Sequence, residues 1–317
     1  MTIAVLLLAV LAAAWLLTGA FRRYALHQDL LDHPNDRSSH VAPTPRGGGI
    51  AMVVAYCGGL VALHAVGVLP TSWLAAALGA GGLIAMIGFS DDHQHVAPLL
   101  RLAVHFAAAL WALYWVGGEQ ATWFAVIIVL GLVWATNLFN FMDGIDGIAA
   151  LETATVALGG ALLSWAALPG APWAAPLLLA AACTGFLAWN FPPAKIFMGD
   201  VGSGFLGISI GVLALASGLY WAWLILISAF VVDATFTLFR RVARRERVHH
   251  AHRSHAYQNA AARFGHRPVT LAVGAINVVW LWPLALLVAN GSLHPAAGIA
   301  IAFVPLVGLV AYFRAGK

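Results

Sequence analysis

Eleven stretches of this chain are apolar over about the 20 residues that a helix needs to cross a bilayer. Only 9% of the residues are charged and 62% are hydrophobic, and the mean hydropathy is +0.88. Soluble domains average roughly 25% charged residues, so the composition indicates an all-α polytopic membrane protein. No polar interval is long enough for a soluble domain, and we expect one integral-membrane domain over residues 1–317. The apolar stretches cover residues 3–21, 48–67, 72–90, 99–117, 122–140, 148–167, 173–191, 203–219, 221–239, 270–289 and 295–313.

The first apolar stretch has the length of a signal peptide, but Met1-Thr2-Ile3 carries no basic residue and Arg22 follows the stretch directly. We therefore expect a retained helix with the N terminus outside. Alternation of about eleven spans then places the C terminus in the cytoplasm. The cytoplasmic connections are expected at residues 22–47, 90–99, 140–148, 191–203 and 240–269.

All 16 Lys and Arg residues fall in these connections, in the C-terminal tail or at the adjoining helix ends. The external connections contain none, which is the positive-inside pattern and supports the orientation. The isoelectric point near 9.4 would also suit a nucleic-acid-binding protein, but the basic residues lie in short loops beside membrane spans. Anionic membrane lipids and phosphorylated substrates are the expected partners, and nucleic acid is not.

Carboxylates gather on the same side of the membrane. Of the 12 Asp and Glu residues, Glu119 alone is placed in an external connection. The positive-inside rule does not require this, because acidic residues contribute little to topology. The clustering therefore indicates a functional site at the cytoplasmic boundary.

The stretch from Asn137 to Gly147 is the most informative polar segment. Side chains with oxygen atoms recur at every third residue, as Asn137, Asn140, Asp143 and Asp146. On a helix each step of three residues drifts by roughly 60°, so the two asparagines share a face, and the glycines allow a turn that brings the aspartates round. Carboxylate and amide oxygens are what Mg²⁺ and sugar hydroxyls require. A capped turn between two helices explains only part of the series.

Asp91 and Asp92 directly follow the third apolar stretch. Carboxylates at the C-terminal end of a helix face the negative end of its dipole, and adjacent carboxylates repel each other. A cation or a metal-bound phosphate would compensate, and Arg101 is one candidate partner. The alternative is a solvated loop without a ligand.

Asp200 stands at the start of the eighth apolar stretch among glycines that include Gly202. A glycine-rich helix N terminus presents backbone N–H groups to phosphate, and the carboxylate of Asp200 is a candidate metal ligand. The alternative is a simple N-cap aspartate.

Two longer connections add candidate ligands. The first contains Asp32-His33-Pro34-Asn35 and Arg46 before a run of glycines, although taken alone this segment is better explained as a polar loop with a glycine-rich helix entry. In residues 240–269, the arginine run is expected to rest on anionic headgroups, and Arg253 to Gln258 offers donors suited to pyrophosphate. The histidines of this connection have no thiolate beside them that would complete a zinc site.

Taken together, these segments resemble the polyprenyl-phosphate N-acetylhexosamine-1-phosphate transferases, relatives of the phospho-N-acetylmuramoyl-pentapeptide transferases. The resemblance covers nearly the whole chain and is carried above all by Asn-x-x-Asn-x-x-Asp-Gly-x-Asp-Gly at Asn137–Gly147. It implies a Mg²⁺ enzyme, with Mn²⁺ as the alternative ion. It also implies metal ligands at Asn140 and Asp200, and a reaction centre formed by Asp91, Asp92, Asp143 and Asp146. The expected substrate-binding residues are Asp32, Asn35, Arg46, Arg101, Asn137, Gly202, Arg253, His255, Tyr257 and Gln258.

Two departures from the family pattern indicate which sugar donor the protein uses. Many members carry His-x-His-His where this chain reads His255-Ala256-Tyr257-Gln258, and lysines that follow the aspartate pair in the peptidoglycan enzyme are replaced by Gln94 and His95. Both departures favour the branch that initiates O-antigen synthesis over a muramoyl-pentapeptide transferase, which stays the alternative. The implied reaction is attack of undecaprenyl phosphate on the β-phosphorus of a UDP-N-acetylamino sugar, with release of UMP. It would take place at the cytoplasmic face of the bacterial inner membrane, for lipopolysaccharide or related envelope glycans.

A lipid-linked sugar transporter is the competing class of function, because polar residues in membrane spans often line a pathway. Transport requires polar groups at mid-bilayer, and here the membrane centre and the external loops are nearly free of charge. A covalent aspartyl intermediate and a homodimer are both compatible with the sequence.

Overall fold

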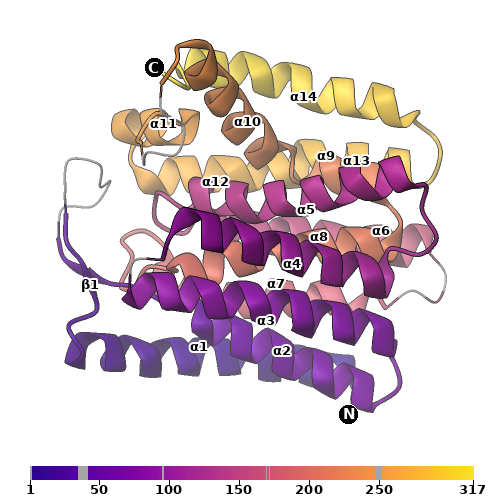
Figure 1. Ribbon diagram of the computed structural model, residues 1–317, viewed down its shortest axis with the longest axis horizontal. Coiled ribbons are helices and arrows are strands. Elements are labelled where there is room, and N and C mark those ends of the chain that lie inside the picture. The colour runs from indigo at the N-terminus through magenta and orange to yellow at the C-terminus, as the bar shows by residue number, and fades with distance from the viewer. Residues whose placement is uncertain (1, 35–41, 95, 169, 171, 247–251) are drawn as a thin grey trace.

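The computed structural model describes residues 2–34, 42–94, 96–168, 170, 172–246 and 252–317. In these residues the chain is a bundle of helices with one short antiparallel hairpin, in which Leu31 pairs with Pro45 and Asp32 with Thr44 (Figure 1). The elements are α1 (Ile3–His27), β1 (Leu31–Asp32), β2 (Thr44–Pro45), α2 (Ile50–Ala65), α3 (Thr71–His93), α4 (Pro98–Val116), α5 (Thr122–Met142), α6 (Ile148–Ala167), α7 (Ala174–Asn190), α8 (Asp200–Ser217), α9 (Tyr220–Leu226), α10 (Ser228–Ala243), α11 (Ala256–Phe264), α12 (His266–Ile276), the π-helix η1 (Asn277–Leu281), α13 (Trp282–Ala289) and α14 (Pro295–Tyr312).

Every predicted apolar stretch coincides with helix, and the all-α polytopic membrane fold is confirmed. Among the described residues, eight helices are long and apolar enough to cross a membrane, or nine if the bent pair α9 and α10 is one span. The apolar helices α2 and α7 are shorter, with 16 and 17 residues. The two chain ends lie at opposite ends of the bundle, as an odd number of crossings requires (Figure 1). The number of eleven spans stays a prediction.

The structure differs from the expected continuous span at residues 221–239. Helices α9 and α10 meet at Ile227 with a bend of 76°. Hydropathy reports how apolar a segment is and not the direction of its backbone, so the apolar stretch gave no sign of this bend.

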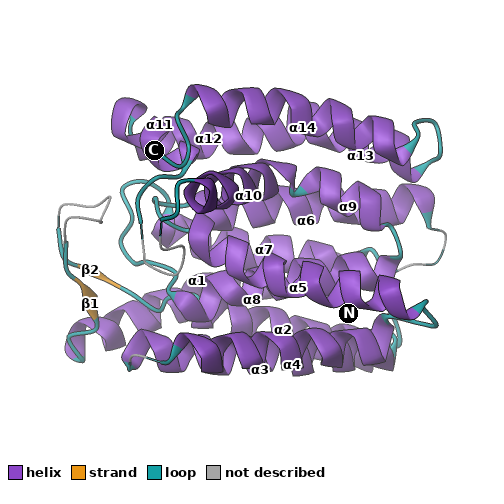
Figure 2. Cartoon of the chain, turned by 45° about the horizontal axis from the view of Figure 1, so that its top comes forward, coloured by secondary structure: helices purple, strands orange, loops and turns teal. Residues whose placement is uncertain are grey.

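The central helices of the bundle are α6 and α8. In their most apolar windows 78% and 72% of the residues are buried, compared with 17% for α4 and 22% for both α1 and α14. Because α8 begins at Asp200, this half-buried carboxylate lies at one end of a central helix that packs mainly against α3 and α5 (Figure 2).

Glycines let the helix ends around Asp200 approach one another closely. A Cβ atom on Gly88 of α3 would lie 2.5 Å from the backbone oxygen of Asp200, and one on Gly49 would lie 2.4 Å from the Cα atom of Gly202. No side chain fits at such distances, so the backbones of α3, α8 and the segment before α2 are in direct contact. This contact positions the first turn of α8.

Inside the bundle, a polar contact joins α6 to the π-helix. The amide nitrogen of Asn277 lies 2.7 Å from both the Glu152 carboxylate and the Thr155 hydroxyl. All three residues are buried, so these contacts hold the π-helix against α6 inside the bundle.

We expect Gly88→Ala to destabilise the protein by about 1–3 kcal/mol, because the new methyl group overpacks the contact between α3 and α8. Gly82→Ala on the same helix is the matched control, since a Cβ there meets no atom within 4 Å. The control should match or slightly exceed the wild-type protein, because alanine favours helix by about 0.5–1 kcal/mol over glycine. Thermal unfolding in detergent measures both, and equal midpoints for the two variants would contradict the packing argument.

Candidate active site

The described parts of the predicted cytoplasmic connections gather at one end of the bundle, together with the β hairpin and the C terminus (Figure 2). There, the end of α3 contributes Asp91 and Asp92, the end of α5 contributes Asn140, and the start of α8 contributes Asp200. Three segments far apart in the sequence therefore meet at one point and bring Asp91, Asp92 and Asp200 together.

Arg101, near the start of α4, joins two members of the cluster. Its guanidinium group donates to the Asp91 carboxylate and, at 3.1 Å, to the Asp200 carboxylate. The second oxygen of Asp91 accepts a hydrogen bond of 2.8 Å from the backbone N–H of Val96. The chain thus supplies one of the cations that the adjacent aspartates were expected to need.

Asp92 binds the first turn of α8 instead of facing solvent. Its two carboxylate oxygens accept from the backbone N–H groups of Asp200 at 3.0 Å and Val201 at 3.1 Å, and the residue is 5% exposed. These N–H groups have no partner within their own helix, so Asp92 caps α8 from another segment. The positive end of the helix dipole also stabilises a carboxylate at this position.

Asn140 fixes the orientation of Asp200. Its side-chain nitrogen donates to the Asp200 carboxylate at 2.8 Å and to the Ser203 hydroxyl at 3.1 Å. The amide oxygen of Asn140 is therefore directed away from both and is the atom available to a ligand.

Asp143 and Asp146 have different surroundings although three residues separate them. Asp146 is held by the backbone N–H of Ala194 at 3.0 Å and lies 3.2 Å from the His266 ring, which ties this turn to α12. The carboxylate of Asp143 accepts no hydrogen bond from the described residues. Burial, and then the nearby carboxylates of Asp200, Asp92 and Asp146, raise the pKa of Asp143 well above its ordinary value.

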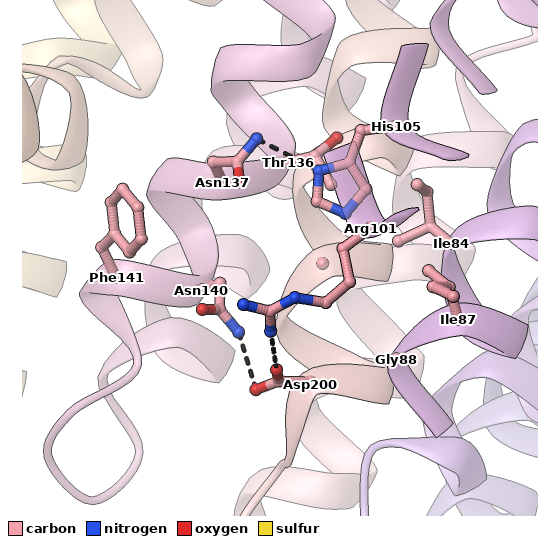
Figure 3. Close-up of a pocket in the computed structure, with 11 residues that line it drawn as sticks. Ile84, Ile87, Gly88, Arg101, His105, Thr136, Asn137, Asn140, Phe141 and Asp200 are labelled. Atoms are coloured by element: carbon pink, nitrogen blue, oxygen red, sulfur yellow. Dashed lines mark hydrogen bonds and ion pairs between the residues drawn. The ribbon is translucent and has the colours of Figure 1, made fainter. Parts of the chain in front are cut away.

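A pocket of about 410 Å³, including its open mouth, lies beside this cluster between α3, α4, α5 and α8 (Figure 3). Arg101, Asn137, Asn140 and Asp200 present polar atoms to it, and His105 lies at its upper wall. The remaining lining residues are Ile84, Ile87, Gly88, Thr136, Phe141 and Gly204. An apolar wall with a few convergent polar groups is typical of a small-molecule site.

The predicted phosphate-binding segment at Arg253–Gln258 packs over the turn that follows α5. The Tyr257 hydroxyl donates to the Phe141 carbonyl at 2.9 Å, and Gly144 leaves the space for it, since a Cβ there would lie 2.2 Å from this hydroxyl. Burial, and next the Asp233 carboxylate, raise the pKa of Tyr257, so the phenol stays a donor. The Gln258 side chain accepts from the His255 backbone N–H in a capping box.

Sequence reasoning missed Asp233, which positions this segment. Its carboxylate accepts from the backbone N–H groups of Ala256 at 3.0 Å and Tyr257 at 2.9 Å, and it lies 3.4 Å from the His255 ring. An aspartate within an apolar stretch was the available signal, because such a buried carboxylate needs partners.

The other predicted substrate-binding residues have mixed positions. Arg46 donates to the backbone carbonyl of Asp92, so it is next to the cluster. Gly202 is buried against Gly49, Asp32 lies in β1 and Arg253 is exposed. Asn35 lies outside the described residues, and the binding roles of all these residues stay predictions.

Comparison with known proteins agrees with this arrangement. Residues 74–218 match glycosyl transferase family 4. The chain is 29% identical to a probable undecaprenyl-phosphate N-acetylglucosaminyl 1-phosphate transferase of Bacillus subtilis, over 84% of this chain and 79% of the relative. It is 28% identical to a decaprenyl-phosphate N-acetylglucosaminephosphotransferase of Mycolicibacterium smegmatis, over 94% and 86% of the two chains. It is 31% identical to a phospho-N-acetylmuramoyl-pentapeptide-transferase of Synechococcus elongatus, over 72% and 68%.

The fold and the comparisons define a multi-pass membrane transferase. The chain belongs to glycosyl transferase family 4, and the resemblance predicted from its motifs is confirmed.

The residues of the cluster fit a divalent cation. No three His, Cys, Asp or Glu side chains form a ready cage for a metal within the described residues. Mg²⁺, however, is usually held by one or two carboxylates together with substrate phosphates and water. The unbonded carboxylate of Asp143, the carboxylate of Asp200 and the amide oxygen of Asn140 supply such a donor set, and the carboxylates around Asp143 leave negative charge to be compensated.

We expect Asp92→Asn to keep the fold and the shape of the pH–rate profile, because the carboxylate serves as a helix cap and not as a base. Losing one of its two bonds to α8 should cost about 1 kcal/mol of stability. Steady-state rates across the pH range and thermal unfolding test both points. A wild-type ionisation that the variant lacks would instead identify Asp92 as a proton acceptor.

Asp143→Asn should stabilise the protein at neutral pH when a chelator is present. The raised pKa means that folded Asp143 binds a proton that the unfolded chain has lost, so wild-type stability falls as pH rises above the ordinary value of 3.8. The amide side chain of the variant does not ionise, so the variant does not lose this stability. Its unfolding midpoint should therefore fall less than that of the wild type as pH rises. Glu119→Gln, at an exposed carboxylate far from the cluster in the sequence, is the control and should follow the wild-type curve. A wild-type midpoint that rises through this range would contradict the argument.

Proposed function

We propose that this protein transfers an N-acetylamino-sugar 1-phosphate from a UDP-sugar to undecaprenyl phosphate and releases UMP. The observation that carries the proposal is the meeting of Asp91, Asn140, Asp200 and Arg101 beside a pocket at the charged end of a membrane bundle. Soluble and lipid-borne substrates can both reach such a boundary. The relatives named above act on polyprenyl phosphates according to their names, which supports the same acceptor class here.

The chief obstacle to this reaction is repulsion between two anions. A lipid phosphate carries roughly −1.5 to −2 charges at neutral pH, and the pyrophosphate of the donor is also negative. Neutralising charge and aligning the reacting groups should therefore supply most of the catalysis. Arg101, already directed at the cluster, binds phosphate oxygens in this scheme.

Mg²⁺, or Mn²⁺ in its place, would be held by Asp200, Asn140 and Asp143, and would neutralise charge on the donor pyrophosphate. Asp92 and Asp146 position the start of α8 and the turn after α5 through the bonds described above. A nucleophile that is already mostly dianionic needs no base, which agrees with the use of both Asp92 oxygens as a cap. Attack on the β-phosphorus without a covalent aspartyl intermediate is the simpler scheme.

The segment over Gly144 supports the choice of sugar. Tyr257 and Gln258 stand where many family members carry two histidines, and both pack against the turn that bears Asp143. We infer a donor of the O-antigen type, used for lipopolysaccharide or related glycans at the cytoplasmic face of the bacterial inner membrane. A muramoyl-pentapeptide donor is the second candidate, because one of the relatives above is named for that activity.

The decisive experiment incubates the purified protein with undecaprenyl phosphate, Mg²⁺ and a panel of UDP-amino sugars, including UDP-muramoyl-pentapeptide, and measures UMP. We expect release with a UDP-N-acetylhexosamine and its loss on chelation. Release with the muramoyl donor alone would select the second candidate. No release with any donor, from folded protein, would exclude the transferase function and return attention to transport.

Arg101→Lys should lower kcat/KM by about 10–100-fold, because Nη1 of Arg101 donates to both carboxylates and leaves the other guanidinium N–H groups for phosphate, whereas lysine has a single nitrogen for all three contacts. Arg263→Lys, at an exposed arginine stacked near Phe264, is the matched control and should retain full activity. Equal rates for both variants would mean that Arg101 does not contact the reacting groups.

A further inference from the structure

His105 lines the pocket but takes no part in the reaction as described above. It follows Arg101 by one turn on α4, so the two side chains face the same way, towards Asn137 and Asn140 of α5 (Figure 3). What His105 can do in the pocket depends on which of its two ring nitrogens carries the proton and on what that nitrogen faces.

The hydrogen bonds of Asn137 determine the tautomer of the His105 ring. Its side-chain nitrogen donates to the Val133 carbonyl at 2.7 Å, which can only accept, so the amide orientation is fixed. The same nitrogen lies 3.1 Å from Nδ1 of His105. Its second N–H therefore points at Nδ1, which must accept, and the neutral ring carries its proton on Nε2.

The Nε2–H group is left to face the pocket. Among the described residues Nε2 has no hydrogen-bond partner, and His105 is only partly buried. Figure 3 shows this nitrogen on the side of the ring away from Asn137, towards the Arg101 side chain. The pocket thus has a neutral donor beside a cation on one helix, a pair suited to an anionic oxygen.

The position of His105 indicates which substrate carries that oxygen. It lies about 6 Å further along α4 than Arg101, towards the membrane interior, as four residues of helix require. Helix α4 is also an outer helix with 17% of its apolar window buried, and Leu99 and Leu100 beside Arg101 are 82% and 54% exposed. A nucleotide sugar arrives from the aqueous side, whereas a lipid phosphate reaches this depth from the membrane.

We propose that His105 is an acceptor-binding residue whose Nε2–H donates to a phosphate oxygen of the polyprenyl phosphate, with Asn137 holding the ring in the required tautomer. The proposal rests on the proposed function for the identity of the acceptor. Arg101 supplies charge, and His105 supplies direction, because a hydrogen bond orients the lipid phosphate where charge alone would not.

The test compares His105→Phe, which keeps a ring and removes both nitrogens, with His105→Gln, whose amide can accept from Asn137 and donate to the pocket. We expect the Phe variant to raise the KM for undecaprenyl phosphate about tenfold, the size of one lost hydrogen bond to a charged group, with little change in the KM for the UDP-sugar. The Gln variant should restore most of the loss. The matched control is His64→Phe, which should behave as wild type. His64 lies in the last turn of α2, and among the described residues its side chain bonds only to the Leu69 carbonyl.

A rise in the KM for the UDP-sugar instead, a fall in kcat with both KM values unchanged, or a Gln variant no better than Phe would each overturn the proposal.

Equilibrium binding of undecaprenyl phosphate and of undecaprenol to the same variants separates this inference from the proposed function. Wild-type preference for the phosphate, lost in the Phe variant and kept in the Gln variant, supports His105 even if no UMP is released. UMP release with unchanged acceptor binding in the Phe variant rejects His105 alone. If the Phe variant does not fold, the Gln variant decides, since it must bind the phosphate lipid within about threefold of wild type.

Discussion

The two hydrogen bonds from Asp92 to the first turn of α8 are the contact on which the rest of the site depends. They join the end of one helix to the start of a central one, where glycines allow the backbones to touch. Asp200 is thereby placed beside Arg101 and Asn140, and the pocket opens next to them. Without this cap, the buried N–H groups at the start of α8 would lack partners, which costs about 1–3 kcal/mol for each unsatisfied group.

A second aspartate of the site also caps a helix from a distant segment. Asp233 caps α11 as Asp92 caps α8, each through two backbone N–H groups of a distant segment. The capped helix in that case carries Tyr257 and Gln258, which cover the turn after α5. The two buried carboxylates of Asp92 and Asp233 therefore have structural roles, whereas the carboxylate of Asp200 lines the pocket. Aspartates of similar appearance in the sequence have separate tasks because their neighbours differ.

Much of the fold followed from local properties of the chain. Runs of apolar residues predicted the helices, and the shared position of the charged residues predicted that 90–99, 140–148 and 191–203 would meet. The bend at Ile227 did not follow, because hydropathy carries no information on backbone direction. The role of His105 could not be predicted either. A single histidine in an apolar helix does not indicate a function until the structure places Asn137 opposite it.

The order of amino acids was thus enough to establish a membrane bundle, the side on which its polar groups collect and the kinds of ligand atom they offer. These are properties of short segments: hydrophobic length, charge and side-chain chemistry. Which aspartate caps a helix, which pairs with Arg101 and which is left to bind a ligand was decided by tertiary structure alone. Hydrogen bonds act over about 3 Å, and only the packing of α3, α4, α5 and α8 brings particular atoms within that distance.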